Sequence, residues 1–128
     1  MQIEHIAVWV ENLETMRDFY IKYLGAASSG NYTNSKTNFS SYFLSFGENK
    51  TRIELMYYPD IKENNGRNCR MGIAHFAVSA GSKNTVDELT ERLRADGYKI
   101  ASEPRTTGDG YYESVILDPE GNFVEITV

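Results

Sequence analysis

The sequence predicts an α+β fold built from two copies of one β-α-β-β-β module. The first observation is a repeat, because the segment IEHIAV at residues 3–8 recurs 70 positions later as IAHFAV at 73–78. The second is that a helical pattern follows each copy. The third is that both halves end on a similar segment, RIEL at 52–55 and FVEI at 123–126. An internal repeat of this kind indicates two equivalent supersecondary units.

The first strand of each module leads into a predicted helix. In the first half, Asn12 is suited to cap a helix whose apolar residues recur with a period near 3.6 as far as Gly25. In the second half, Ser82 is the corresponding cap and Gly97 the corresponding end. Both modules therefore share a strand-then-helix start.

Three further strands complete each module, because segments rich in β-formers alternate with polar turns. They are expected at residues 26–33, 41–46 and 52–55, and at 98–103, 112–117 and 123–126. Module 1 then covers about residues 1–58 and module 2 about 71–128, joined by a polar linker at about 59–70. A chain of 128 residues has the size of one compact domain, so we expect a single domain.

Composition and charge narrow the class of partner. A net charge of -5 argues against nucleic acid, which needs a cationic surface, and no apolar stretch is long enough to span a bilayer. The start of the chain lacks the features of a signal peptide, and the single cysteine, Cys69, suits a reducing compartment. We therefore expect a cytoplasmic protein with a small-molecule partner.

The candidate site consists of two histidines and two glutamates in equivalent positions of the modules. Because side chains alternate along a strand, His5 and Glu54 point away from the aliphatic face of their strands, and so do His75 and Glu125. The chain has only two histidines, and both fall at matching repeat positions with a glutamate near the end of the same module. If the modules are related by an approximate two-fold, all four side chains can meet.

A divalent cation explains why two carboxylates would stand in a sheet interior. An uncompensated buried carboxylate costs several kcal/mol or becomes protonated. Two nitrogen and two oxygen ligands suit Zn, Ni, Co, Mn or Fe(II), with room for water or substrate when the ion is five- or six-coordinate. The sequence therefore predicts one metal site formed by His5, Glu54, His75 and Glu125.

These motifs resemble glyoxalase I members of the vicinal oxygen chelate (glyoxalase/bleomycin resistance/extradiol dioxygenase) superfamily over essentially the whole chain. The matching segments are EHIAV at 4–8, RIEL at 52–55, IAHFAV at 73–78 and DPEGNFVEI at 118–126. The resemblance implies that the two modules form a cupped mixed sheet around the metal, with the helices on its outer face. It also implies Ni, Zn or Co as the usual metal, and a homodimer whose sites take ligands from one chain or from both.

The resemblance further implies a reaction. A glyoxalase I, or lactoylglutathione lyase, converts the hemithioacetal of a 2-oxoaldehyde such as methylglyoxal and a thiol into a 2-hydroxyacyl thioester through a metal-bound enediolate. By similarity, Glu125 is the first candidate for the general base, and Glu54 serves the opposite face of the substrate. Such an enzyme detoxifies methylglyoxal.

Two departures from the family pattern concern the thiol. Trp9 stands where glutathione-using relatives often have an arginine, and the asparagine expected shortly after Glu54 is missing. The thiol cosubstrate is therefore left open. Aromatic and methionine side chains make an adaptable surface instead. The candidate substrate contacts are Trp9, Met56, Tyr58 and Tyr111, the last in a glycine-containing loop at 106–112 that is equally a simple hairpin.

Two other functions are compatible with this fold. An Fe(II) extradiol-type dioxygenase normally uses two histidines and one carboxylate, so a fourth protein ligand counts against it. A non-catalytic small-molecule or antibiotic-binding module of the bleomycin-resistance type typically lacks the ligand set, so intact ligands argue against that function as well.

Overall fold

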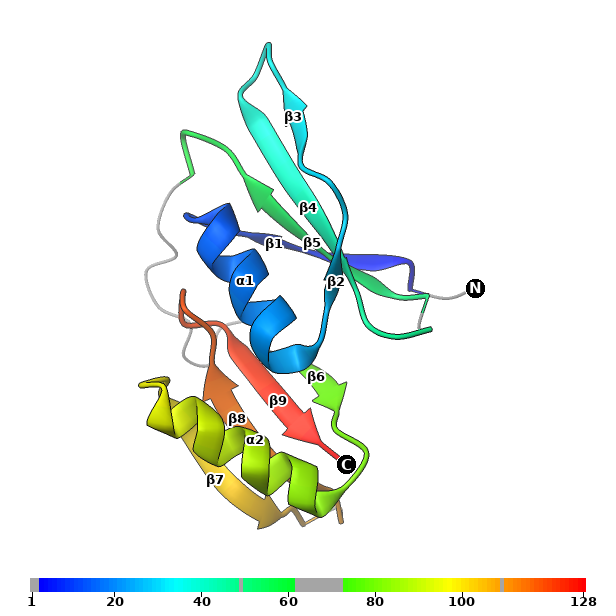
Figure 1. Ribbon diagram of the computed structural model, residues 1–128, viewed down its shortest axis with the longest axis vertical. Coiled ribbons are helices and arrows are strands. Elements are labelled where there is room, and N and C mark those ends of the chain that lie inside the picture. Colours follow the sequence, from blue (N-terminus) through cyan, green and yellow to red (C-terminus); the bar gives the residue numbers. More distant parts are fainter. Residues whose placement is uncertain (1–2, 49, 62–72, 109) are drawn as a thin grey trace. The chain divides into compact units, whose positions relative to one another are not determined.

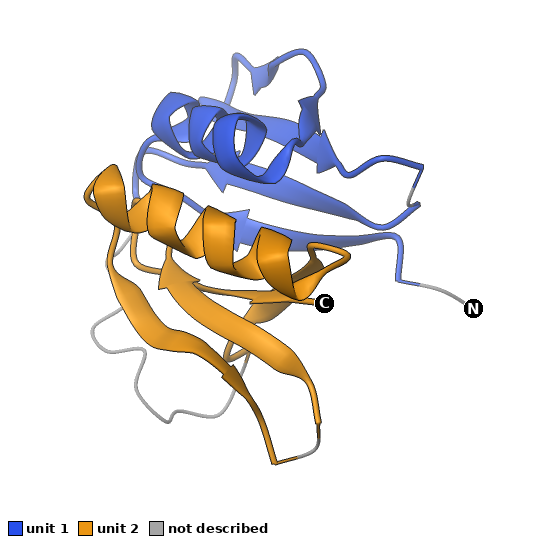
Figure 2. Ribbon diagram, turned by 60° about the horizontal axis from the view of Figure 1, so that its bottom comes forward, with its two compact units in different colours: residues 1–64 blue, residues 65–128 orange. Residues whose placement is uncertain are grey.

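The computed structural model describes residues 3–48, 50–61, 73–108 and 110–128 (Figure 1). The chain divides into two compact units, unit 1 with residues 1–64 and unit 2 with residues 65–128 (Figure 2). The division falls inside the predicted linker at 59–70, most of which, with Cys69, lies outside the described residues. None of the helices in the described ranges is long and apolar enough to cross a membrane.

Unit 1 contains one helix and one mixed sheet. Its sheet has the order β1-β5-β4-β2, with β3 also paired to β4. The first and last strands of the unit, β1 and β5, are parallel neighbours, whereas β4 is antiparallel to its partners. The elements are β1 (His5–Trp9), α1 (Leu13–Leu24), β2 (Ala27–Ser28), β3 (Tyr32–Asn34), β4 (Phe39–Ser45) and β5 (Arg52–Tyr57).

Helix α1 begins and ends where the sequence predicts. The side chain of Asn12 accepts a hydrogen bond of 3.0 Å from the backbone N–H of Thr15, which satisfies one of the free donors of the first turn. Gly25 ends the helix with φ 66, a left-handed conformation that suits glycine. Four aromatic or methionine side chains of α1 are buried on the sheet, namely Met16, Phe19, Tyr20 and Tyr23.

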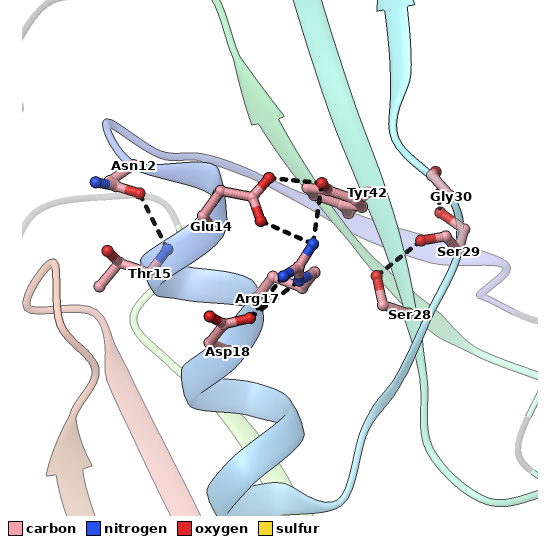
Figure 3. Close-up of polar contacts among 9 residues, drawn as sticks. All are labelled: Asn12, Glu14, Thr15, Arg17, Asp18, Ser28, Ser29, Gly30 and Tyr42. Carbon is pink, nitrogen blue, oxygen red and sulfur yellow. Dashed lines mark hydrogen bonds and ion pairs between the residues drawn. The ribbon is translucent and has the colours of Figure 1, made fainter.

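A polar network also ties α1 to β4 (Figure 3). The Arg17 guanidinium donates to the Tyr42 hydroxyl at 3.0 Å, and that hydroxyl donates to Glu14 at 2.6 Å. Arg17 also pairs with Glu14 at 2.7 Å. The helix is therefore fixed on the sheet by directional contacts as well as by apolar packing.

Unit 2 repeats this arrangement. Its sheet has the order β6-β9-β8-β7, and its first and last strands, β6 and β9, are again parallel neighbours. Figure 2 shows that each helix lies across one face of the sheet of its own unit. The α+β class and the repeated modules are thereby confirmed. The elements are β6 (Phe76–Ser79), α2 (Lys83–Ala95), β7 (Ile100–Thr106), β8 (Tyr112–Leu117) and β9 (Phe123–Thr127).

The predicted caps of α2 are also present. Ser82 accepts from the Thr85 N–H at 3.2 Å, and Gly97 takes φ 90 just after the helix. On the side of α2 that faces the sheet, the polar residue Thr90 is fully buried. Its hydroxyl shares a 2.7 Å hydrogen bond with the buried hydroxyl of Ser114 on β8. Sequence periodicity did not identify this pair.

Several strand boundaries differ from the prediction, including β4 and β5, which are each longer by one or two residues. The strand expected at 26–33 is two short strands, because the Ser29 hydroxyl accepts from the Phe43 N–H in place of a backbone ladder bond. β6 begins at Phe76, where its pairing with β9 starts, so His75 lies one residue before the strand. β7 runs later than residues 98–103 and has register shifts on either side of Ser102, in an edge strand that contains Pro104.

Candidate metal centre

In unit 1 the parallel pairing of β1 and β5 brings His5 and Glu54 together. Ala7 is the direct partner of Glu54, so His5 lies one same-face position away along β1. The His5 Nε2 and Glu54 Oε2 atoms are 3.8 Å apart. The neighbours of Glu54 along β5, Ile53 and Leu55, are buried in the core, and the carboxylate therefore points to the sheet face opposite α1.

Unit 2 brings His75 and Glu125 together in the same way. Ala77 is the direct partner of Glu125, and His75 precedes Ala77 by two residues, as His5 precedes Ala7. The His75 Nε2 and Glu125 Oε2 atoms are 3.4 Å apart. The same register of parallel strands thus produces the same histidine–glutamate pair twice.

The two pairs suit a divalent cation chemically. Only 15% of the Glu54 side chain and 17% of the Glu125 side chain are exposed, so each carboxylate needs a charged or hydrogen-bonding partner. Metal–ligand bonds of about 2.0 to 2.2 Å require nitrogen and oxygen ligands separated by about 3.0 to 3.4 Å. The unit 2 pair has this separation at 3.4 Å, and the unit 1 pair is wider at 3.8 Å.

Whether both pairs form one site is a question about the two units together, and it stays a prediction. Within residues 3–48, 50–61, 73–108 and 110–128, no group of three or more histidine, cysteine, aspartate or glutamate side chains is close enough to hold a metal. The structure therefore shows two separate histidine–glutamate pairs, each with one imidazole nitrogen near one carboxylate oxygen.

His5 has further contacts that the sequence did not predict. The Glu4 carboxylate contacts His5 Nδ1 with one oxygen and the Arg52 guanidinium with the other. The hydrogen bond with His5, and next the one from Arg52, hold the pKa of Glu4 below its ordinary value. Phe43 meets the His5 ring edge-on, with centroids 5.5 Å apart. In the sequence, Glu4 and Arg52 are opposite charges near the starts of two strands. Their contact depends on the register that places Arg52 opposite His5, which the sequence alone does not give.

Two of the predicted substrate residues share the sheet face of His5 and Glu54. Trp9 is 52% exposed and is the register partner of Met56. Trp9 meets Phe39 edge-on at 6.3 Å, and Tyr32 lies 6.2 Å from Phe39. We call Trp9, Tyr32 and Phe39 the aromatic shelf.

The other two predicted substrate residues are placed differently. Tyr58 follows the end of β5 and is partly exposed. Tyr111 belongs to unit 2, where its N–H donates to the Thr107 hydroxyl at 3.1 Å and its carbonyl accepts from the Thr107 N–H at 2.8 Å. These bonds close the β7–β8 connection as a hairpin. Asp109 of that loop lies outside the described residues.

The chain shares its fold and its sequence pattern with a known superfamily. Residues 2–126 match the Glyoxalase/Bleomycin resistance protein/Dioxygenase superfamily, and the chain belongs to it. Its members typically bind divalent metals.

Individual relatives extend the likeness over the whole chain. The uncharacterized protein YqjT of Bacillus subtilis (strain 168) is 29% identical over 97% of this chain and 96% of its own length. The glyoxalase family protein from Enterococcus faecalis has a TM-score of 0.79 at 19% identity, covering 99% of this chain and 97% of that one. The trypanothione-dependent glyoxalase I of Leishmania major has a TM-score of 0.79 at 20% identity, covering 99% and 86%. At these identities the solved structures show the fold.

Proposed function

We propose that the chain is a divalent-metal-dependent isomerase of the glyoxalase I type, converting the hemithioacetal of a 2-oxoaldehyde and a thiol into a 2-hydroxyacyl thioester. The observation that carries the proposal is the paired geometry: His5–Glu54 and His75–Glu125 stand at the same register of two repeated units, with nitrogen–oxygen separations of 3.8 and 3.4 Å. Together the two pairs contain the four metal ligands that the sequence predicts. Membership of the superfamily supports the proposed reaction.

The four ligands divide into two roles. The imidazoles of His5 and His75 hold the ion as neutral nitrogen donors, and the glutamates balance its charge. When bound, the cation supplies a Lewis acid that stabilises negative charge developing on the substrate oxygens. Ni, Zn and Co are the metals we propose first, with Fe and Mn as further candidates for this donor set.

Proton transfer falls to the glutamates. In the proposed reaction, Glu125 removes the proton from C1 of the substrate, the C–H electron pair forms a C1–C2 double bond, and the electron pair of the C2 carbonyl moves onto its oxygen. A proton is then returned to C2, and the C1 hydroxyl gives up its proton to become the carbonyl of the thioester while the C2 oxygen takes up a proton. The Glu125 side chain is only 17% exposed and lies beside His75. Its carboxylate would therefore be shielded from water when it is free of the metal and accepts the proton of the substrate. Glu54, its equivalent in unit 1, serves the opposite face of the substrate.

The aromatic shelf supports a thiol with an apolar portion. It lies on the same sheet face as His5 and Glu54, and Trp9 occupies the position where glutathione-using relatives often carry an arginine. A bare carboxylate gains no ionic contact from an indole ring, whereas an apolar or aromatic group stacks on it. We further propose a homodimer that acts on methylglyoxal in the cytoplasm.

The test is metal analysis of the purified protein, then reconstitution with Ni, Zn, Co or Fe and assay with methylglyoxal plus a panel of thiols. Isomerase activity that depends on the metal and disappears on chelation is expected. Oxygen uptake with a catechol and Fe(II) would instead identify a dioxygenase. A protein that retains no metal would be a small-molecule-binding module.

A further inference from the structure

Glu4 lies beside His5 at the start of the β1–β5 pair and contacts both His5 and Arg52. Glu4 contacts the Nδ1 atom of His5 with Oε2 and the Arg52 Nη2 atom with Oε1. The backbone supports the arrangement, because the Arg52 N–H donates to the Glu4 carbonyl at 2.9 Å. Glu4 is thereby held between a histidine and an arginine.

This contact decides which nitrogen of His5 carries the proton. An ionised carboxylate only accepts hydrogen bonds, and every nitrogen of an arginine side chain is a donor. Glu4 Oε1 is paired with the Arg52 guanidinium, which is the contact of a carboxylate that accepts hydrogen bonds. The Nδ1 atom must therefore be the donor, which leaves the lone pair of a neutral ring on Nε2, the atom directed at Glu54.

The orientation of the ring is fixed from a second side. Phe43 meets His5 at an interplanar angle of 90°. The Arg52 guanidinium carbon lies 4.1 Å from the centre of the Phe43 ring, so the cation that holds Glu4 is itself held against an aromatic face. Proton position and ring plane of His5 are thus set by neighbours other than Glu54.

Unit 2 lacks these side chains at the equivalent positions. Ala74 precedes His75, Phe123 takes the place of Arg52 on the last strand, and Val115 takes that of Phe43 as the partner of the glutamate. Apolar side chains cannot accept a hydrogen bond from an imidazole. His75 therefore serves as an internal comparison for His5.

We propose that Glu4, held by Arg52, is a positioning residue that fixes His5 as the Nδ1–H tautomer and presents its Nε2 atom to the metal. The inference rests on the proposed function in so far as His5 is a metal ligand. A carboxylate behind a histidine ligand raises its basicity and removes the need to select a tautomer on binding. Loss of such a partner typically weakens metal binding about 10- to 100-fold.

The first test is the tautomer itself, measured on the metal-free full chain by long-range ¹H–¹⁵N NMR at about pH 9, where ordinary histidines are neutral. With only two histidines in the chain, the His75→Gln variant assigns both sets of signals. Wild-type His5 should be protonated on Nδ1, and Glu4→Ala should shift it toward the Nε2–H form while His75 stays unchanged. An Nε2–H form in the wild type, or the same tautomer in Glu4→Ala, would overturn the proposal.

The second test is the dissociation constant for Co²⁺ or Zn²⁺ of the same proteins. Glu4→Ala should weaken binding about 10- to 100-fold. Glu4→Gln, which keeps an acceptor oxygen, should lose less. The matched control is Glu91→Ala, which removes another exposed, arginine-paired glutamate from unit 2 and should leave the affinity unchanged. Equal affinity of Glu4→Ala and wild type would overturn the positioning role.

These measurements also separate this inference from the proposed function. A wild-type protein that binds no metal would end the proposed function, and the tautomer result would still decide the role of Glu4 at His5. A purely structural role would lower the unfolding midpoint of Glu4→Ala and leave the His5 tautomer as in the wild type. If Glu4→Ala does not fold, Arg52→Gln gives the same readout by removing the group that holds Glu4.

Discussion

Glu125 lies between two fully buried neighbours on β9, Val124 and Ile126, and its carboxylate is 3.4 Å from the Nε2 atom of His75. A glutamate in this position can act as a ligand and as a base. A glutamine substitution separates the two roles. The amide oxygen of glutamine can still bind a metal weakly, but it does not act as a base.

Glu125→Gln should therefore lower turnover about 100- to 10,000-fold, the usual contribution of a general base, and change the metal dissociation constant by a much smaller factor. Steady-state kinetics and metal titration of the same preparation measure both. Glu88→Gln, on the exposed side of α2, is the control and should keep both values. Parallel losses of turnover and of metal would remove the base assignment.

Trp9 determines the expected thiol preference. Replacing it with arginine introduces a cation on the sheet face of His5 and Glu54, where it can pair with a carboxylate of glutathione. A charge-assisted hydrogen bond is worth about 1.5 to 3 kcal/mol, so kcat/KM for the glutathione adduct should rise about 10- to 150-fold relative to that for an apolar thiol. Trp9→Phe keeps an aromatic surface and should leave the preference unchanged. An unaltered ratio in Trp9→Arg would exclude this face as the thiol site.

The sequence predicted each histidine–glutamate pair because strand alternation and the repeat together specify face and position. It did not predict the contact of Glu4 with His5. Glu4 lies one residue before β1, where alternation no longer assigns a face, and its long side chain reaches back to its neighbour. Arg52 was visible as a charge near a strand end, but its partner depended on the register of β1 against β5.

At the scale of elements, α2 and β8 share a buried hydroxyl pair. Thr90 and Ser114 are fully buried, and Thr90 also donates toward the Val86 carbonyl at 2.7 Å. Thr90→Val keeps the side-chain shape but leaves the Ser114 hydroxyl without this partner. The free energy of unfolding should fall by about 1 to 3 kcal/mol, as measured by chemical denaturation.

The double variant Thr90→Val/Ser114→Ala is the control for this prediction. It removes both hydroxyls, so no polar group of the pair is left buried, and part of the lost stability should return. A double variant whose loss equals the sum of the two single losses would show that the hydroxyls do not stabilise each other.

The helices were predicted to within a residue or two because their ends are encoded locally. Asn12 and Gly25 act through contacts within one turn of α1, and Ser82 does so for α2. Strands depend on partners far along the chain. The break between β2 and β3 follows from the bond of the Ser29 hydroxyl to the Phe43 backbone, which spacing along the sequence does not reveal.

For the whole molecule, the repeat explains why one histidine–glutamate pair occurs twice. Each unit places its first and last strands side by side in parallel, and this topology alone brings a residue near position 5 to one near position 54, and one near 75 to one near 125. The sequence predicted the offset between the modules. The sequence also predicted that both pairs bind one shared ion and that the two modules form a single domain. Both statements stay predictions.

The number of divalent ions per chain tests this central prediction most directly. Titration of the metal-free protein with Zn²⁺ or Co²⁺, followed by equilibrium dialysis and metal analysis, should give one tightly bound ion per chain. Two variants remove one pair each, His5→Ala/Glu54→Ala and His75→Ala/Glu125→Ala, and both should lose that ion, because each pair supplies half of its protein ligands. Two tightly bound ions per chain, or an ion retained by either variant, would contradict a shared site.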